Sequence, residues 1–197
     1  MVDLERKVRK LIITGQPKSG RPWRKIIILV EGIYSMEGTI INLPELLRIK
    51  RRYKAAIYLD EAHSIGALGP NGRGVVDYYG EDAREVDVLM GTFTKSFAGA
   101  GGYIAGSRAL VEHVRAHSFS STYAVAMSPV IAKQIACVVE VLMGAEGTGE
   151  EGAGRIEQLA RNTRYFRRRL LQMGFIVYGN DDSPVVPLLL CFCPKIA

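Results

Sequence analysis

The sequence is poor in cysteine and has no long apolar run. Its 197 residues include three cysteines, Cys137, Cys191 and Cys193, which fit neither a disulfide framework nor the spacing of a zinc site. No apolar stretch approaches the roughly 20 residues that a membrane-spanning helix needs. The charged start at residues 1–5 predicts no secretory signal. We therefore expect a reducing compartment and no metal site, and the alternation at Cys191 and Cys193 indicates ordinary strand packing.

Apolar and basic residues are both plentiful. Hydrophobic residues make up 48% of the chain, which is enough for a real core, and the formal charge is +6. Much of the positive charge lies in residues 21–25, 48–54 and 164–169. The last group falls in a predicted helix, where we expect the arginines to form the solvated face. The charge excess therefore does not by itself predict an acidic partner.

Strands alternate with helices over most of the chain. Apolar, β-branched runs predict strands at 25–30, 55–59, 86–90 and 102–105, the first of them buried on both faces. Apolar periodicity and capping residues predict helices at 4–13, 42–53, 107–117, 128–143 and 155–173. Loops are expected at 31–38 and 66–80, and an exposed turn at 144–154. The order predicts an α/β fold with a mostly parallel sheet.

The last part of the chain is predicted to begin a second, smaller domain. Short strands are expected at 175–178 and 185–191. The helix before them has a predicted apolar face, formed by Ile156, Leu159, Ala160, Thr163, Phe166 and Leu170.

Lys95 is the most unusual lysine of the sequence. It lies among hydroxyls and glycines after the predicted strand 86–90, and not on a charged helix face. Ser35, Asp60 and His63 also follow predicted strands, and chemistry in parallel sheets gathers beyond the carboxyl ends of the strands. Pyridoxal phosphate (PLP) chemistry needs a lysine that forms an imine, an acid at the pyridine nitrogen and anchors for the phosphate. We therefore predict a PLP site around Lys95.

Each remaining residue has a predicted role and an ordinary alternative. Asp60 would keep the pyridine nitrogen protonated, but it could equally be a turn acid or a helix cap. His63 would bind the phenolic oxygen of the cofactor or the substrate carboxylate, although a lone histidine is more often structural. Thr92 and Thr94 would hold the phosphate or the lysine loop, although threonine is also common in strands.

A second interpretation comes from the tetrapeptide at residues 60–63, which spells the DEAH box of nucleic-acid helicases. Those enzymes also need an upstream phosphate loop of the form G-x-x-x-x-G-K-[ST]. Residues 69–74 have neither that spacing nor the lysine, and no basic patch interleaved with aromatics is present. We expect no nucleic-acid partner.

Four segments, residues 30–38, 59–66, 69–74 and 91–96, resemble the α-oxoamine synthases. These are fold-type I PLP-dependent transferases, aspartate aminotransferase-like in fold, that condense an amino acid with an acyl-CoA and lose carbon dioxide. Residues 162–187 are similar to the catalytic subunit of the members that use L-serine and palmitoyl-CoA. The resemblance implies formation of 3-ketosphinganine, the first step of sphingolipid synthesis, at the cytosolic face of the endoplasmic reticulum membrane. Two alternatives stay open: glycine or alanine with another acyl-CoA, and an inactive truncated subunit that only assembles with partners.

The resemblance also implies residue roles and partners. Lys95 would hold the cofactor and take the serine α-proton, Asp60 would pair with the ring nitrogen, His63 and Ser35 would contact the ring substituents, and Thr92 would approach the phosphate. A non-catalytic subunit that lacks the lysine would be the heterodimer partner, with small activating subunits and ORM-type regulators. Residues 1–145 would form the second half of the large PLP-binding domain, 146–174 a linking helix region and 175–197 the beginning of the small C-terminal domain.

Three residues depart from the family pattern. Ala98 stands where the family usually has a glycine, and it restricts a backbone that glycine leaves free. Val125 and Ala126 stand where a hydroxyl pair is usual, in a region that tends to reach a neighbouring subunit's phosphate. The family's ring-stacking histidine, carboxylate-binding arginine and membrane anchor have no counterpart in these residues. We therefore expect a central fragment or a short isoform.

Overall fold

The computed structural model describes residues 1–144 and 151–188. The helices are α1 Val2–Thr14, α2 Leu43–Tyr53, α3 Val75–Tyr79, the 3-10 turn η1 Ala83–Glu85, α4 Arg108–His117, α5 Phe119–Tyr123, α6 Pro129–Leu142 and α7 Glu151–Gln172. The strands are β1 Ile27–Glu31, β2 Ile33–Tyr34, β3 Thr39–Ile40, β4 Ala56–Asp60, β5 Val88–Thr92 and β6 Gly102–Gly106. Within the described residues, no helix combines the length and apolar character needed to cross a bilayer.

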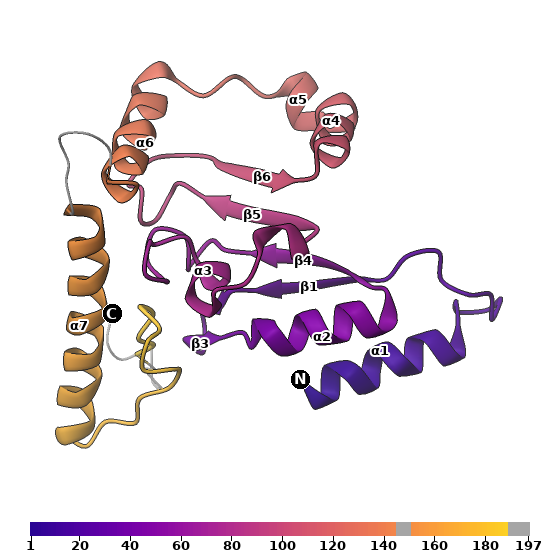
Figure 1. Ribbon diagram of the computed structural model, residues 1–197, viewed down its shortest axis with the longest axis horizontal. Helices are drawn as coiled ribbons and strands as arrows, with labels where there is room; N and C mark the ends of the chain where they lie inside the picture. The colour runs from indigo at the N-terminus through magenta and orange to yellow at the C-terminus, as the bar shows by residue number, and fades with distance from the viewer. Residues whose placement is uncertain (145–150, 189–197) are drawn as a thin grey trace, which may run out of the picture.

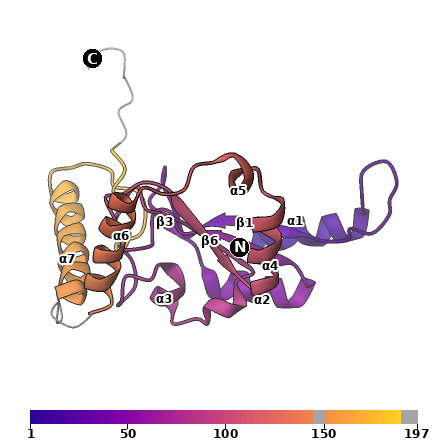
Figure 2. The ribbon, with the colours of Figure 1, turned by 90° about the horizontal axis from the view of Figure 1, so that it is seen from above.

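The main sheet has the order β1-β4-β5-β6 (Figure 1). The first three strands are parallel and β6 runs antiparallel to β5. Figure 1 shows α2 along one side of the sheet and α4, α5 and α6 in an arc beyond β6. In Figure 2 the helices α6 and α7, which contact each other, lie beyond one end of the sheet. The predicted α/β fold with a mostly parallel sheet is confirmed.

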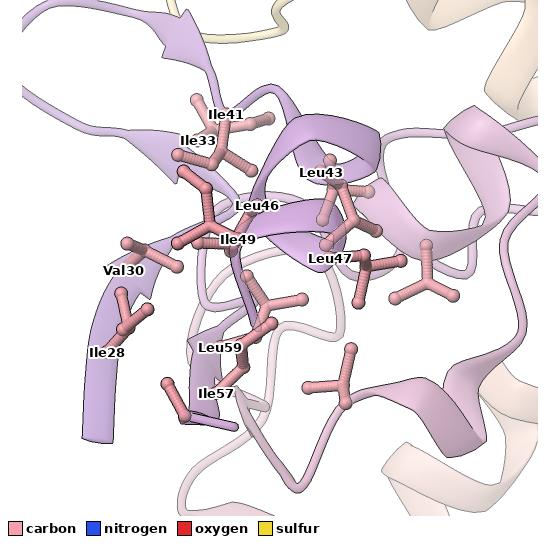
Figure 3. Packing of buried hydrophobic residues seen from close by; sticks show 14 of the residues in the cluster. Ile28, Val30, Ile33, Ile41, Leu43, Leu46, Leu47, Ile49, Ile57 and Leu59 are labelled. Carbon is pink, nitrogen blue, oxygen red and sulfur yellow. The ribbon is translucent and has the colours of Figure 1, made fainter. Parts of the chain in front are cut away.

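The core lies between α2 and one face of strands β1 and β4 (Figure 3). The buried side chains are Ile28, Val30, Ile57 and Leu59 from the strands and Leu43, Leu46, Leu47 and Ile49 from the helix. The side chain of Asn42 accepts a hydrogen bond from the Glu45 backbone N–H at 3.1 Å, which caps α2 as predicted. This packing fixes the position of β4, and with it the position of Asp60 at the strand's carboxyl end.

The strand β1 is buried on one face only, so the prediction of burial on both faces is wrong. Ile27 is 60% exposed and Leu29 is 68% exposed. Nothing in the described part of the chain covers these two side chains, and an apolar run cannot distinguish one covered face from two.

Several short elements were not predicted. The predicted loop at 31–38 contains β2, which pairs with β3, and the predicted loop at 66–80 contains α3. The helix α5 was missed, β5 begins two residues later than predicted, and α7 begins at Glu151, four residues earlier than predicted. Elements of two to five residues are too short to show an apolar period in the sequence. The start of β5 is set by the pairing of Val88 with Tyr58 of β4. Most of the predicted turn at 144–154 lies outside the described residues.

Arg167 in α7 is buried, at 3% exposure, although the arginines of this helix were predicted to be solvated. Its guanidinium donates hydrogen bonds to the backbone carbonyls of Tyr178 at 2.6 Å and Val185 at 2.7 Å. Phe166, predicted on the apolar face, is 51% exposed instead. Arg167 therefore binds the segment after α7 through that segment's backbone carbonyls.

That segment forms no strand, so the prediction of a strand at 175–178 is wrong. Residues 185–188 of the second predicted strand are also irregular, and its remaining residues, 189–191, lie outside the described residues, as does Cys193. The Asn180 side chain accepts a hydrogen bond from the Ile40 N–H at 2.7 Å, and the Asn180 N–H donates to the Gly38 carbonyl at 3.1 Å. The segment is thus held on the β2–β3 hairpin and on α7. The predicted domain boundaries stay a prediction.

Candidate functional site

The carboxyl ends of β4 and β5 lie next to each other. Asp60 is the last residue of β4 and pairs in register with Met90 of β5. The strand β5 ends at Thr92, and Lys95 follows three residues later. Two of the predicted strand-end residues therefore come from neighbouring strands of one sheet, as the sequence indicated.

A cavity of about 710 Å³ opens beside these strand ends. It lies between β5, β6, α4 and α5, and the residues that line it include Thr92, Lys95, Tyr103, Val114, Arg115 and Ser121. Ala62, which lies between Asp60 and His63 in the chain, also lines it, whereas Asp60 and His63 do not. The volume is within the range of small-molecule sites.

The threonines shape the lysine loop. The hydroxyl oxygens of Thr92 and Thr94 are 2.7 Å apart, and the Thr94 backbone N–H donates to the Thr92 hydroxyl at 3.2 Å. The Thr92 hydroxyl is also 3.1 Å from the Gly101 carbonyl, to which it can donate. Phe97 is buried and packs edge-to-face on Phe93, with ring centroids 5.3 Å apart. This geometry supports the loop-holding role of the two threonines, and their contact with a phosphate stays a prediction.

One carboxylate oxygen of Asp60 is hydrogen-bonded within the turn that follows β4. Its Oδ1 atom accepts a hydrogen bond from the Ala62 N–H at 2.8 Å, the contact expected of a turn acid. Its Oδ2 atom has no hydrogen-bond partner within residues 1–144 and 151–188. A single carboxylate can make both contacts, so the turn holds Asp60 in place and leaves one oxygen for a ligand.

His63 lies close enough to Lys95 to be affected by its charge. Burial lowers the pKa of His63 below its ordinary value of 6.5, and the Lys95 ammonium lowers it further, while Glu31 and Asp60 act in the opposite direction. The lowered pKa favours the neutral imidazole, which donates one hydrogen bond from one ring nitrogen and accepts one at the other. Asp60, His63 and Lys95 form one electrostatically connected group.

The depressed pKa of His63 can be measured by NMR titration of its ring. We expect a pKa below 6.5, because burial and Lys95 both disfavour the charged imidazolium. Because the folded protein disfavours protonated His63, the protein is more stable above the unfolded pKa of this histidine. That stability is lost as the pH falls through the lowered folded pKa. Lys95→Met should raise the pKa of His63, whereas Lys133→Met on the exposed side of α6 should leave it unchanged. An unshifted pKa in Lys95→Met would contradict the proximity of the two residues.

Ser35 lies on the neighbouring strand-end turn and does not line the cavity. Its backbone N–H donates to the Glu31 carboxylate at 3.3 Å, and Glu31 pairs with Asp60 across β1 and β4. The structure thus places Ser35 near the same edge of the sheet. Its contact with a cofactor ring stays a prediction.

Glu61, the second acid of the DEAH-like tetrapeptide, has a structural role. It is 2% exposed and accepts hydrogen bonds from the Ser64 hydroxyl and, at 3.0 Å, from the Val75 N–H that begins α3. Burial raises the pKa of this carboxyl. Gly74 has φ +85°, and a side chain there would meet the Glu61 carboxylate. Glu61 therefore fixes the glycine-rich loop, and the described residues hold no cluster of three or more His, Cys, Asp or Glu suited to a metal.

Ala98 adopts the conformation for which glycine is suited. Its φ is +48°, in the left-handed region that costs a residue with a Cβ atom about 1–2 kcal/mol. The expectation that alanine restricts this backbone is consistent with that geometry, since the loop forms but with a strained residue three positions after Lys95.

We expect Ala98→Gly to stabilise the protein. Relief of the left-handed strain exceeds the added entropy of glycine in the unfolded chain, so the free energy of unfolding should rise by about 0.5–1 kcal/mol. Urea denaturation measures the change. Ala116→Gly, in the exposed last turn of α4, is the matched control and should destabilise by up to about 1 kcal/mol. A loss of stability in both variants would contradict the strain at Ala98.

Val125 and Ala126 do not line the cavity, and Val125 is 97% exposed. Beside Thr92 and Tyr103, the cavity has hydroxyls from Ser118, Ser120 and Ser121, which were not predicted as site residues. Arg115 was missed as well. The spacing of Val111, Val114, Arg115 and Ser118 on one helical face was the available signal.

The described site and fold define a class of protein. The family model for class I and II aminotransferases matches residues 1–191, and the chain belongs to this family. The chain is 57% identical to human serine palmitoyltransferase 3 over 194 residues, which cover 98% of this chain and 35% of that protein. It is 58% identical to serine palmitoyltransferase 2 of Caenorhabditis elegans, over 98% of this chain and 34% of that protein. The chain spans about a third of the length of these curated relatives.

Solved structures agree with this assignment. A serine palmitoyltransferase variant from S. paucimobilis with a bound PLP–myriocin aldimine superposes with a TM-score of 0.81 at 28% identity, over 98% of this chain and 46% of that one. A serine palmitoyltransferase structure with a PLP internal aldimine gives 0.74 at 29% identity, over 89% and 40%. The fold-type I prediction and the resemblance on which it rested are confirmed.

Proposed function

We propose that this chain carries the lysine-bearing part of the active site of a PLP-dependent acyltransferase. The reaction is the decarboxylating condensation of L-serine with palmitoyl-CoA to 3-ketosphinganine, in sphingolipid biosynthesis. The observation that carries the proposal is the convergence of Asp60, His63 and Lys95 at the carboxyl ends of two neighbouring parallel strands. The names of the relatives support the choice of substrates.

The residues at this edge fit pyridoxal 5'-phosphate. Lys95 lines the cavity and has no ion-pair partner among the residues that the structure describes, so its amine is available. The Asp60 Oδ2 atom is free of the contact that occupies Oδ1. The cavity carries cations and hydroxyls for a phosphate. When bound, PLP supplies an electron sink that stabilises negative charge at the serine Cα.

The protein's own groups would position the ligands and move protons. Lys95 Nζ would hold the cofactor covalently and, when free, accept the serine α-proton. The Asp60 carboxylate would hold a proton on the pyridine nitrogen, and the neutral His63 ring would orient the phenolic oxygen or the serine carboxylate. Thr92 and Thr94 would hold the lysine loop in the conformation that aims Lys95 into the cavity. Ser35 would contact a ring substituent from the neighbouring turn.

Partners and location follow from the same proposal. A non-catalytic serine palmitoyltransferase subunit 1 would be the heterodimer partner, with small activating subunits and ORM-type regulators, and no nucleic acid. The assembly would act at the cytosolic face of the endoplasmic reticulum membrane. The similarity to serine palmitoyltransferases 2 and 3 supports these proposals.

Cofactor trapping tests the central claim. The chain is incubated with PLP, a visible absorption band is recorded, and the mixture is reduced with borohydride and mapped by mass spectrometry. We expect one reduced adduct, on Lys95. An adduct on another lysine, or none, would refute the assignment. Cofactor binding without consumption of serine and palmitoyl-CoA would favour a subunit that needs its partners for activity.

A further inference from the structure

The cavity beside Lys95 is positively charged. Its lining includes two cations, Lys95 and Arg115, and no carboxylate from the described parts of the chain. Arg115 has no ion-pair partner within those residues, whereas Arg108 on the same helix is paired with Glu112 at 2.7 Å. A concave site lined by charge of one sign concentrates ions of the opposite sign. The cavity is thus suited to an anionic group.

Arg115 is held on the cavity face of α4. Val111 and Val114 line the cavity from the same helix, so the face that carries Arg115 is the one that borders it. The helix ends at His117, and the Ser118 that follows accepts a hydrogen bond from the Ser121 N–H at 3.3 Å. This turn fixes the chain that carries the cavity hydroxyls directly after the arginine.

Three hydroxyls accompany the guanidinium. The Ser118 oxygen is 2.8 Å from the Ser121 oxygen and 3.3 Å from the Ser120 oxygen, and all three residues line the cavity. Guanidinium forks and hydroxyl donors are the groups that bind phosphate oxygens. Lysine, arginine and serine thus surround one space of about 710 Å³.

We propose that Arg115, with the hydroxyls of Ser120 and Ser121, binds a phosphate group of a ligand in the Lys95 cavity. The inference rests on the proposed function, whose two anionic ligands are PLP and an acyl-CoA. Both carry phosphate, so the shared chemistry is a phosphate monoester or diphosphate. Arg115 is a ligand-binding residue in this proposal, and the proton transfers belong to other groups.

Paired ligands with and without phosphate provide the test. Isothermal titration compares PLP with pyridoxal, and coenzyme A with pantetheine, on the wild-type chain, Arg115→Met, Arg115→Lys and the control Arg108→Met. Arg108 is equally cationic and lies on the same helix, but does not line the cavity. Circular dichroism and urea denaturation check that all variants fold.

We expect Arg115→Met to raise the Kd of one phosphate ligand by about tenfold or more, with Arg115→Lys between it and wild type. Pyridoxal and pantetheine should bind all variants equally. A change confined to PLP assigns the cofactor phosphate, and one confined to coenzyme A assigns the phosphates of the acyl carrier. The proposal would be overturned if Arg115→Met and Arg108→Met bound PLP and coenzyme A with equal Kd values. It would also be overturned if the wild-type chain bound neither ligand.

This result is separable from cofactor attachment. If borohydride labels Lys95 while Arg115→Met binds both ligands normally, only the Arg115 assignment fails. If Lys95 is not labelled while coenzyme A affinity depends on Arg115, the phosphate site stands and the proposed reaction fails.

Discussion

Lys95→Met is expected to abolish covalent retention of PLP. Methionine keeps the length and apolar stem of the side chain but has no amine, so neither the visible absorption band nor a borohydride-stable adduct should form. Under the proposed function, consumption of palmitoyl-CoA in the presence of serine should fall by about 10³-fold or more, since Lys95 would supply both attachment and proton acceptance. Absorbance, mass spectrometry of the reduced protein and a thiol-release assay measure the three effects.

Lys133→Met is the matched control for this experiment. Lys133 is an exposed lysine on α6, outside the residues that line the cavity. It should retain the adduct and the activity of the wild-type chain. Retention of a reducible adduct by Lys95→Met would mean that another amine holds the cofactor, and the loop after β5 would then not be the attachment site.

The fold was predictable where an apolar run ended in polar residues. The β4 run stops at Asp60, and the α2 cap at Asn42 is encoded within four residues of sequence. Burial of the second face of β1 was not predictable, because Ile27 and Leu29 are apolar residues whether or not a helix packs on them. The short helix α3 begins at Val75, whose N–H donates a hydrogen bond to the Glu61 carboxylate 14 residues earlier in the chain. No local apolar period predicts this helix.

The site divides in the same way. The positions of Asp60, His63 and Lys95 were predictable because each lies at or just after the end of a strand, and the parallel order of the sheet brings such positions together; their roles stay predictions. Arg115 follows no strand directly: β6 ends at Gly106, opposite Val88 at the start of β5, and Arg115 lies in the last turn of the following helix α4, which borders the cavity. Arg167 was predicted wrongly because burial of a guanidinium requires acceptors that are remote in sequence, here the carbonyls of residues 178 and 185.

Arg167→Met is expected to cause the largest loss of stability. Removal of the buried guanidinium leaves the part-buried carbonyls of Tyr178 and Val185 without their charged donor, at a cost of about 3 kcal/mol in the free energy of unfolding. Arg167→Lys keeps a charge but cannot reach both carbonyls as a fork does, so it should recover only part of the loss. Urea denaturation gives the global change.

A local measurement distinguishes loss of the Arg167 contacts from general destabilisation. The Ile40 N–H donates to the Asn180 side chain, so release of that segment should speed hydrogen exchange at Ile40 before the core opens. Arg168→Met, one residue along α7 and exposed, should change neither quantity. If Arg167→Met matched Arg168→Met in both the free energy of unfolding and the hydrogen exchange rate at Ile40, the segment after α7 would be held by its contacts with the hairpin alone. If only Arg167→Met exposes Ile40, this buried arginine couples α7 to the hairpin that carries Ser35, and so to the edge of the sheet where Asp60 lies.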